Sequence, residues 1–401
     1  MPRWDIVFDP KIDTRHPDTV KLSVEIEAFR RSVLKIPVQP ALRRELDRMN
    51  IVRQIKGTTG LEGNPISEER IDKLMMEGPN KYGAEGRVLS PEEREVVNVQ
   101  RALSFISRHV RDNPGSLVSQ PLIRRLHEIN TEQCDYPDNI PGEYRHHDSV
   151  VGEYATPDHR AVPGLMERFE AFINSREVVE GYQTPIRAVL AHFYLVSIHP
   201  FGDGNGRTAR ALEAYLLYQG KYNVRGFYSL ANHYYRHRRE YMDALQNARF
   251  ESSGDLNQFV RFALAGFVSE LEAIQEEILK YVKKVLFRDL YLEFLTEDTI
   301  NRRMAAVLEV LALLLPSGQG IPVEQYKNRS HPISAGLYEG KSDRTLLRDL
   351  KTLQSLQLVH ISDGKLRAND QLLDQLSSGD FSLDSADMAS EAPLGAREPP
   401  T

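Results

Sequence analysis

The chain has 401 residues, of which 41% are hydrophobic and 27% charged, and its formal net charge at pH 7 is −6. This is the composition of a globular protein with a sizeable core, and the acidic balance gives no general reason to expect nucleic acid or a membrane surface as the main partner. Cys134 is the only cysteine, which excludes an intramolecular disulfide and a thiolate metal cluster. The apolar segments are too short for a signal peptide or a membrane span, so we expect a cytoplasmic protein without membrane contact.

The first hundred residues carry the pattern of several helices. Apolar residues recur along one face over residues 40–55, and the stretch GTTGLEGNP then interrupts this pattern. Ser67 is expected to begin the next helix, and Ser90 to cap a further helix that has Pro91 at its first position. A fourth helix is expected over SQPLIRRLHEINTE.

Residues 141–163 break the helical pattern because they are rich in glycine and proline. Two short β-prone pieces in this segment, SVVG and EYAT, predict a small β-hairpin. Helical periodicity resumes in GLMERFEAFINS, TPIRAVLAHFYLVSI and TARALEAYLLYQG, and the last of these is expected to end at Gly220. Two more helices are expected over about 237–249 and about 255–287.

The chain after about residue 299 has a different outline. It begins with the apolar helix TINRRMAAVLEVLALLLPSG and continues with a short helix, PVEQYKNR, and a longer one, SDRTLLRDLKTLQSLQLV. A hairpin with its turn at Asp363 and Gly364 follows. This order of elements predicts a winged helix-turn-helix domain. The polar, acidic tail from about Ser377 is expected to be disordered.

The stretch SIHPFGDGNGRTARALEAYLL places a glycine-rich loop between two apolar helices. Pro200 cannot lie inside the preceding helix, so the chain must leave helical geometry near His199. The glycines at 202, 204 and 206 permit a backbone nest that holds an anion at the start of the next helix. Arg207 and Arg210 point to the same side of that helix because they are three residues apart. The nest and the two guanidinium groups together suit a di- or triphosphate.

Two further residues of this loop add chemistry to binding. Asp203 is a hard oxygen ligand beside the expected phosphates, which suits Mg²⁺. His199 is a side chain that can accept a proton from a hydroxyl near neutral pH. Each feature alone is more often structural, as a turn or a packed histidine. Their occurrence in this order predicts a phosphoryl- or nucleotidyl-transfer site.

The segment HPFGDGNGRTAR resembles the signature of Fic-domain proteins, His-Pro-Phe-x-(Asp/Glu)-Gly-Asn-Gly-Arg-x-x-Arg, at every specified position. The resemblance implies that His199 is the general base for a Ser, Thr or Tyr hydroxyl of a target protein, and that Asp203 holds Mg²⁺ against the phosphates of ATP. It also implies an anion hole formed by Gly204, Asn205 and Gly206. Arg207 and Arg210 would hold the triphosphate. AMP would pass to the target protein, or to the chain itself, and pyrophosphate would leave.

The resemblance extends to residues outside this loop. The branch of the family that transfers a terminal phosphate carries lysine at position 206, so Gly206 favours nucleotidyl transfer. The segment PGEYRHHDSVVG resembles the family's flap, which implies that Val150 and Val151 dock the target by strand addition. Tyr241 would line the nucleotide pocket. His192 also fits the family's pattern, and the alternative is a packed core histidine.

Upstream of the core, TTGLEGN resembles the family's inhibitory motif, (Ser/Thr)-x-x-x-Glu-(Gly/Asn), through Thr58, Glu62 and Gly63. The resemblance implies that Glu62 pairs with Arg210, takes the place of the γ-phosphate and inhibits the chain from within. A conformational change or altered oligomerisation, with a homodimer as one form, would relieve the inhibition. The alternatives are a simple turn between helices and, as in some relatives, a glutamate that supports removal of AMP.

The longer C-terminal helix and its start carry four basic residues, Lys341, Arg344, Arg348 and Lys351. Such a row suits a recognition helix for DNA, and the alternative is a solvated face in a module for protein contacts. The rival functions are therefore a DNA-binding regulator with a nucleotide-sensing core and a transferase with another nucleotide donor.

The expected fold class is mainly α, with a Fic-type helical core, a small β-hairpin flap and a C-terminal winged helix-turn-helix domain. The expected parts are residues 1–100 for the N-terminal region with the inhibitory segment, 101–287 for the catalytic core, 288–376 for the winged-helix-like domain and 377–401 for the tail. ATP and Mg²⁺ are the expected substrate and cofactor, and no structural metal is expected.

Overall fold

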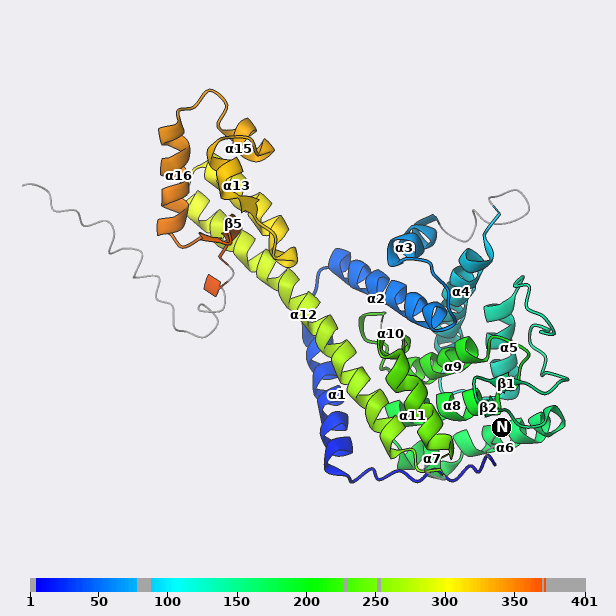
Figure 1. Ribbon diagram of the computed structural model, residues 1–401. Helices are drawn as coiled ribbons and strands as arrows, with labels where there is room; N and C mark the ends of the chain where they lie inside the picture. The colour runs from blue at the N-terminus through cyan, green and yellow to red at the C-terminus, as the bar shows by residue number, and fades with distance from the viewer. Residues whose placement is uncertain (1–4, 78–87, 227–229, 251–253, 370, 373–401) are drawn as a thin grey trace, which may run out of the picture. The chain divides into compact units, whose positions relative to one another are not determined.

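The computed structural model describes residues 5–77, 88–226, 230–250, 254–369 and 371–372 (Figure 1). The predicted tail over 377–401 lies outside the described residues. The described part is mainly helical, and its strands form two small antiparallel sheets. The chain divides into two compact units, Met1–Gln275 and Glu276–Thr401. Within the described residues, no helix combines the length and the apolar character that crossing a membrane requires.

The N-terminal part of the first unit consists of α1 (Pro17–Lys35), α2 (Pro40–Leu61), α3 (Glu68–Glu77) and α4 (Pro91–Asp112). The predicted start of α4 is confirmed, because the Ser90 side chain accepts a hydrogen bond from the Glu93 N–H and the Glu93 side chain accepts one from the Ser90 N–H. The sequence pattern did not predict α1.

The prediction that GTTGLEGNP interrupts the second helix is wrong in part, because α2 continues through the two glycines to Leu61. The glycines serve close packing. A Cβ on Gly57 would come within 2.5 Å of the backbone of Ala231 and Asn232, and a Cβ on Gly60 would come within 2.6 Å of the Tyr235 ring. Tertiary packing of α2 against α10 (Ala231–Arg236) therefore outweighs the low helix propensity of glycine.

Two helices form the centre of the first unit, α8 (Thr184–Ile198) and α9 (Asn205–Gln219). They lie on either side of the glycine-rich loop in the sequence and pack against each other. Helix α9 also contacts α2, α4 and α5 (Gln120–Thr131), and Figure 1 shows it among these helices. Both helices are almost entirely buried, α8 mostly through apolar side chains and α9 through apolar side chains together with buried polar ones such as Arg207, Arg210 and Glu213. Gly220 ends α9 as predicted.

The remaining elements of the first unit surround this pair. The predicted small hairpin is confirmed as β1 (Val150–Val151) and β2 (Tyr154–Ala155), with Val150 opposite Ala155. The helices that follow are the 3₁₀ turn η2 (His159–Ala161), α6 (Val162–Ile173), α7 (Arg176–Gly181) and α11 (Arg238–Phe250). Helix α12 (Asn257–Thr296) is longer than predicted, because Tyr291 and Phe294 continue its apolar pattern beyond residue 287 and pack in the core of the second unit.

The second unit has its own core. Its helices are α13 (Arg302–Leu314), α14 (Val323–Lys327), α15 (Pro332–Leu337) and α16 (Asp343–Ser355), and its strands are β3 (Ile321–Pro322), β4 (Val359–Ser362) and β5 (Lys365–Ala368). The strands pair in the order β3-β5-β4. The predicted hairpin is confirmed, because Asp363 and Gly364 both have positive φ, 51° and 69°, as a tight two-residue turn requires. The short elements β3 and α15 were not predicted.

Candidate functional site

The glycine-rich loop begins where α8 ends. His199 adopts the left-handed conformation, with φ 51° and ψ 59°, and Pro200 follows it, so the helix cannot continue. Gly204 is also left-handed, with φ 73°, and α9 begins at the next residue. The departure from helical geometry near His199 is therefore as predicted, and the loop leads directly into a buried helix.

Local contacts fix the shape of the loop. The side chain of Asn205 accepts a hydrogen bond from the Phe201 N–H and donates one to the Phe201 carbonyl, both at 2.9 Å. The Phe201 ring is fully buried and stacks on the imidazole of His127, with the ring centroids 3.8 Å apart. These contacts make one short, rigid turn of the loop.

His127, on α5, supports the loop through its ring and a hydrogen bond, and it was not predicted as a site residue. Its Nδ1 accepts a hydrogen bond from the Gly142 N–H, so its Nε2 donates to the carbonyl of Asp203, 2.9 Å away. Burial lowers the pKa of His127 to about 4, which keeps the ring neutral. The available signal was its place one turn after Ile123, on the side of α5 that is expected to be buried.

The start of α9 offers backbone N–H groups that suit an anion. The N–H groups of Asn205, Gly206 and Arg207 are the first of the helix and have no partner within it. Such groups and the positive end of the helix dipole both attract anions. The carboxylate of Glu62 lies against this helix start, because a Cβ built on Gly206 would overlap Glu62 Oε1. A carboxylate thus takes the position that suits a phosphate.

Arg210 is held by the end of α2. Its Nη2 donates to Glu62 Oε1 at 2.5 Å and to the carbonyl of Thr58 at 3.0 Å, and its Nε donates to the Thr58 hydroxyl at 2.6 Å. The Arg210 side chain is only 3% exposed, while that of Glu62 is 38% exposed. Burial acts to raise the pKa of Glu62, but the charges of Arg210 and Arg207 and the hydrogen bond from Arg210 hold that pKa below its ordinary value.

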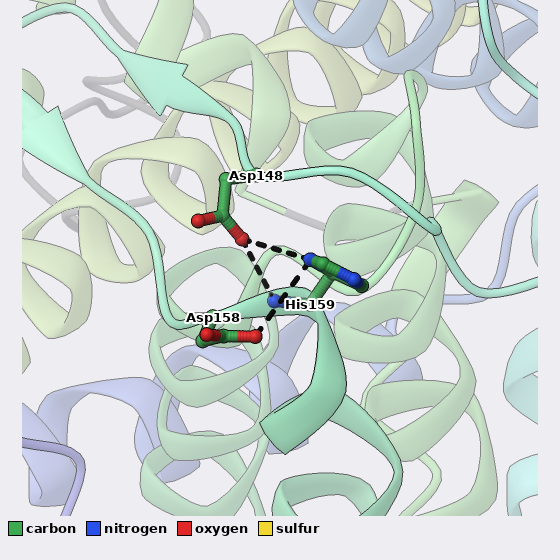
Figure 2. Close-up of side chains that lie close together, drawn as sticks. All are labelled: Asp148, Asp158 and His159. Carbon is green, nitrogen blue, oxygen red and sulfur yellow. Dashed lines mark hydrogen bonds and ion pairs between the residues drawn. The ribbon is translucent and has the colours of Figure 1, made fainter.

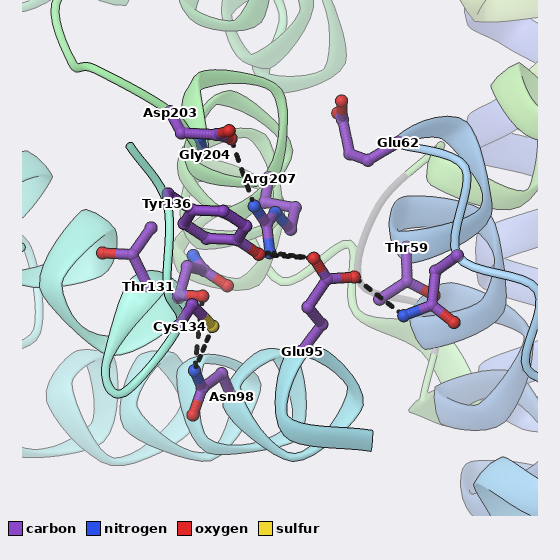
Figure 3. Close-up of polar contacts among 12 residues, drawn as sticks. Thr59, Glu62, Glu95, Asn98, Thr131, Cys134, Tyr136, Asp203, Gly204 and Arg207 are labelled. Atoms are coloured by element: carbon purple, nitrogen blue, oxygen red, sulfur yellow. Dashed lines mark hydrogen bonds and ion pairs between the residues drawn. The ribbon is translucent and has the colours of Figure 1, made fainter. Parts of the chain in front are cut away.

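Arg207 has acidic partners of its own. Its Nη1 lies 3.2 Å from Glu95 Oε1 and donates to the Tyr136 hydroxyl at 2.6 Å, and its Nη2 lies 3.4 Å from Asp203 Oδ1. Figure 3 shows the guanidinium between Asp203 and Glu95, beside the Tyr136 ring. The other oxygen of Glu95 accepts a hydrogen bond from Asn64 at 2.7 Å. Neither Glu95 nor Tyr136 was predicted from the sequence, because each lies many residues from Arg207 and no sequence motif connects them to it.

Asp203 lies beside the start of α9 and has one carboxylate oxygen that is not bound within the described part of the chain. Its Oδ1 accepts hydrogen bonds from the Gly204 N–H and from Arg207, and among the described residues no hydrogen bond reaches its Oδ2. The side chain is 49% exposed. A single free carboxylate oxygen fits Mg²⁺, which is commonly held by one or two carboxylates together with substrate phosphates.

His199 presents one ring nitrogen for chemistry. Its Nδ1 lies 3.4 Å from the carbonyl of Val196, which makes Nδ1 the protonated nitrogen and leaves Nε2 as an acceptor. The pKa of His199 is lowered to about 4, first by burial and then by the charges of Arg249 and Arg145, against the opposing effects of the Val196 carbonyl and Glu62. A neutral imidazole at physiological pH can take a proton from a hydroxyl.

Tyr241 lies within a buried polar cluster. Its hydroxyl is 2.9 Å from His192 Nε2, and its ring stacks on Tyr234. His192 in turn pairs with Glu213, with 2.7 Å between Nδ1 and Oε2, and both side chains are fully buried. His192 is therefore a packed histidine with partners on both nitrogens.

The hairpin of β1 and β2, here called the flap, presents Val150 with 53% of its surface exposed, while Val151 is half-buried. Figure 2 shows the base of the flap, where Asp148 Oδ1 accepts hydrogen bonds from the His159 N–H and, at 3.0 Å, from the ring Nδ1. The ligand atoms of Asp148, Asp158 and His159 lie within 4.8 Å of one another. Arg160 already pairs with both oxygens of Asp158, at 3.0 and 2.8 Å. We therefore interpret this cluster as a structural contact between the segments before and after the flap, and not as a metal site.

Known proteins resemble this chain in the region of the site. Residues 118–217 match the Fic/DOC family. The protein adenylyltransferase Fic of Culex quinquefasciatus is 30% identical over 213 residues, which are 53% of this chain and 39% of that protein. The protein of the same name from Aedes aegypti is 29% identical over the same length. The chain therefore contains a Fic domain, and it spans about two fifths of the length of these curated relatives.

Solved structures share the fold. A Fic family protein from Desulfovibrio desulfuricans G20 has a TM-score of 0.52 and 18% identity, over 92% of this chain and 98% of that one. Fic-1 (residues 134–508) from C. elegans has a TM-score of 0.52 and 23% identity, over 65% of this chain and 72% of that one. The predicted mainly helical fold class is thereby confirmed. Glu62, Glu95 and Tyr241 lie outside residues 118–217, so their roles rest on the geometry of this chain.

Proposed function

We propose that the chain is a protein adenylyltransferase that moves AMP from ATP to a Ser, Thr or Tyr hydroxyl of a target protein and of itself. The observation that carries the proposal is the joint position of a neutral His199, the N–H groups at the start of α9 that have no partner within the helix, and two buried arginines on that helix. The names of the relatives support the same activity.

The proposed reaction assigns one task to each group. The N–H groups of Asn205 and Gly206, with Gly204, hold the α-phosphate, and Arg207 and Arg210 hold the outer phosphates. Nε2 of His199 takes the proton of the target hydroxyl as its oxygen attacks the α-phosphorus. The bond between the α-phosphorus and the bridging oxygen breaks, and pyrophosphate leaves. Mg²⁺ held by Asp203 would neutralise charge on the phosphates.

We propose further that Glu62 inhibits this reaction from within the chain. Its carboxylate takes one Nη donor of Arg210 and lies against Gly206, so an anion of the same kind cannot use these groups at the same time. A charge-assisted bond to a buried arginine is about twice as strong as a neutral hydrogen bond. ATP would then bind in a pose in which the α-phosphorus is out of line with the hydroxyl. A change of conformation or of oligomeric state, with a homodimer as one form, would relieve the inhibition.

In the proposed complex, Val150 and Val151 on the flap dock the target by strand addition, and Tyr241 lines the nucleotide pocket. The exposed position of Val150 supports the first assignment. The hydroxyl of Tyr241 is bound to His192, so the contact proposed for Tyr241 uses its ring.

The test of the reaction type compares ATP labelled at the α-phosphate with ATP labelled at the γ-phosphate, with Mg²⁺ and the Glu62→Gly variant. Adenylyl transfer predicts label on the protein from the α-position alone. Label from the γ-position alone would show phosphoryl transfer and overturn the proposal. UTP and other labelled nucleotides, tested in parallel, decide between ATP and another donor, and release of AMP from modified protein tests the reverse reaction.

A second candidate function concerns the second unit, for which we propose a winged-helix-like module that binds duplex DNA. Arg344, Arg348 and Lys351 are all exposed on α16, with Lys341 just before it. The test is fluorescence anisotropy of the full chain with labelled duplex DNA at low and physiological salt. Binding that the double variant Arg344→Glu, Arg348→Glu abolishes would support the module, whereas binding that this variant leaves unchanged, or no binding at low salt, would rule it out.

A further inference from the structure

Arg145 joins three separate segments around the proposed base. Its Nε donates to the carbonyl of His199 at 2.8 Å, its Nη1 to the carbonyl of His147 at 2.7 Å and its Nη2 to the carbonyl of Pro157 at 2.6 Å. Its own N–H donates to the carbonyl of Pro200 at 2.9 Å. One side chain thus ties the chain before the flap and the chain after it to the residue that carries the reactive imidazole.

The environment of Arg145 shows that these hydrogen bonds stabilise its buried guanidinium group. The side chain is fully buried, and the nearest carboxylate atom, Asp148 Oδ1, lies 4.0 Å away on a side chain that is 51% exposed. Burying a guanidinium is costly unless its donors are satisfied. Here three backbone carbonyls accept hydrogen bonds from the guanidinium donors. The guanidinium carries its donors on three separate nitrogens, whereas a lysine ammonium has all of its donors on one nitrogen.

Other contacts hold the flap in the same place. The Tyr154 hydroxyl, from β2, donates to the carbonyl of Ser197 at 2.8 Å, two residues before His199. Thr156 donates to the carbonyl of Ser149 through its N–H at 3.2 Å and through its hydroxyl at 2.8 Å, which closes the hairpin. Arg145 is the one residue of this group that binds the segments on both sides of the flap and the His199 backbone.

We propose that Arg145 is a positioning residue, which fixes the flap relative to His199 so that a docked hydroxyl meets the Nε2 of this histidine. The proposal rests on the proposed function, because it concerns how the target is placed for adenylyl transfer. The flap is then held in its working position before any target binds. Loss of Arg145 should impair transfer without impairing the hold on ATP, since the nucleotide groups lie on α9.

The first arm of the test measures activity in the Glu62→Gly background. We expect Arg145→Met to lower the rate of self-modification from α-labelled ATP at least tenfold and to change the dissociation constant for ATP less than twofold. Arg145→Lys, which keeps the charge and part of the bonding, should lie between. The matched control is Arg187→Met, because Arg187 also donates to a backbone carbonyl, that of Ile173 at 3.1 Å. It lies twelve residues before His199 on α8, about 18 Å along the helix.

The second arm does not depend on activity. Hydrogen–deuterium exchange of the ligand-free chain should show at least tenfold faster exchange in residues 149–157 for Arg145→Met and no change there for Arg187→Met. Thermal unfolding shows whether each variant is folded, and if Arg145→Met is not, Arg145→Lys takes its place in both arms.

Flap exchange unchanged in the Arg145 variant, or an equal loss of transfer in the Arg187 variant, would overturn the proposal. If the Glu62→Gly parent itself transfers no label, adenylyl transfer fails as the function. The exchange arm then still decides whether Arg145 fixes the flap.

Discussion

At the scale of single residues, the proposed chemistry depends on how the fold positions His199. The left-handed backbone at this residue turns the chain out of α8, the Val196 carbonyl selects the ring tautomer, and Arg145 binds the main-chain carbonyl. A non-glycine residue rarely holds this conformation without support, so these contacts together determine where the imidazole points.

The lowered pKa of His199 leads to a prediction for the pH dependence. Because this pKa is about 4, the ring stays neutral and competent as pH falls through 6.5, the ordinary histidine value. In the Glu62→Gly variant, kcat/KM should therefore be nearly constant from pH 8 to about pH 5.5. Arg249→Met removes a charge that lowers this pKa, so its acid limb should lie at higher pH. A rate that halves near pH 6.5 in the parent would contradict the assignment.

The two residues that bind Arg210, Glu62 and Thr58, should contribute unequally to the proposed inhibition. Glu62→Gly removes a charged partner and should raise self-modification tenfold or more, while Thr58→Val removes one hydroxyl acceptor and should raise it about two- to fivefold, as expected for a bond worth about 1 kcal/mol. Initial rates with α-labelled ATP measure both. A Thr58→Val variant as active as Glu62→Gly would show that Glu62 is not the main source of the proposed inhibition.

At the scale of elements, α2 is the helix that brings Thr58 and Glu62, the residues proposed to inhibit the reaction, to Arg210. It packs against α10 through Gly57 and Gly60 and ends at the residue before Glu62. The position of this helix therefore determines whether the Glu62 carboxylate reaches Arg210, so changes in its packing should act on both stability and activity.

Gly57→Ala tests this relation. The added Cβ would lie 2.5 Å from backbone atoms of Ala231 and Asn232, which cannot move aside as a side chain can. We expect a loss of about 1–3 kcal/mol in stability, together with faster self-modification because the end of α2 shifts. Thermal unfolding and label transfer measure the two effects. The control is Gly164→Ala in α6, where a Cβ would have no atom within 4 Å and the change should be neutral or slightly stabilising. Equal effects of the two substitutions would refute the packing argument.

The elements also show which parts of the molecule the sequence can predict. Three local signals each predicted the structure that is found: the Ser90 cap, the Asp363–Gly364 turn and the break at Pro200. The continuation of α2 through its glycines was missed, because it depends on a helix that lies far away in sequence. The same reason applies to the site. His127, Arg145 and Glu95 act through partners that no spacing relates to them, whereas the loop from His199 to Arg210 is contiguous.

At the scale of the whole molecule, the buried histidines link stability to pH. The pKa values of His127, His199 and His233 are each lowered to about 4 by burial. Between pH 4 and 6.5 the unfolded chain thus binds more protons than the folded chain, so stability increases with pH across this window and is lost as pH falls through about 4.

Thermal unfolding between pH 4.5 and 6.5 measures this linkage. We expect the unfolding temperature of the first unit to fall as pH is lowered through this range, with a free-energy change on the order of a few kcal/mol. His233→Gln should reduce the dependence by about one proton, because His233 Nε2 is buried without a hydrogen-bond partner among the described residues. A stability that is flat over this range, or that increases as pH falls, would contradict the burial of these rings as neutral species.

The measurement that tests the central claim most directly is transfer of label from α-labelled ATP with Mg²⁺ by three full-length chains: the parent, Glu62→Gly and Glu62→Gly with His199→Ala. The account predicts weak self-modification in the parent, at least tenfold more in the first variant and none in the second, with all three chains folded. Equal labelling of the parent and the Glu62 variant would contradict inhibition by Glu62. Labelling that survives the loss of His199 would contradict its role as the base, and silence in all three would contradict adenylyl transfer itself.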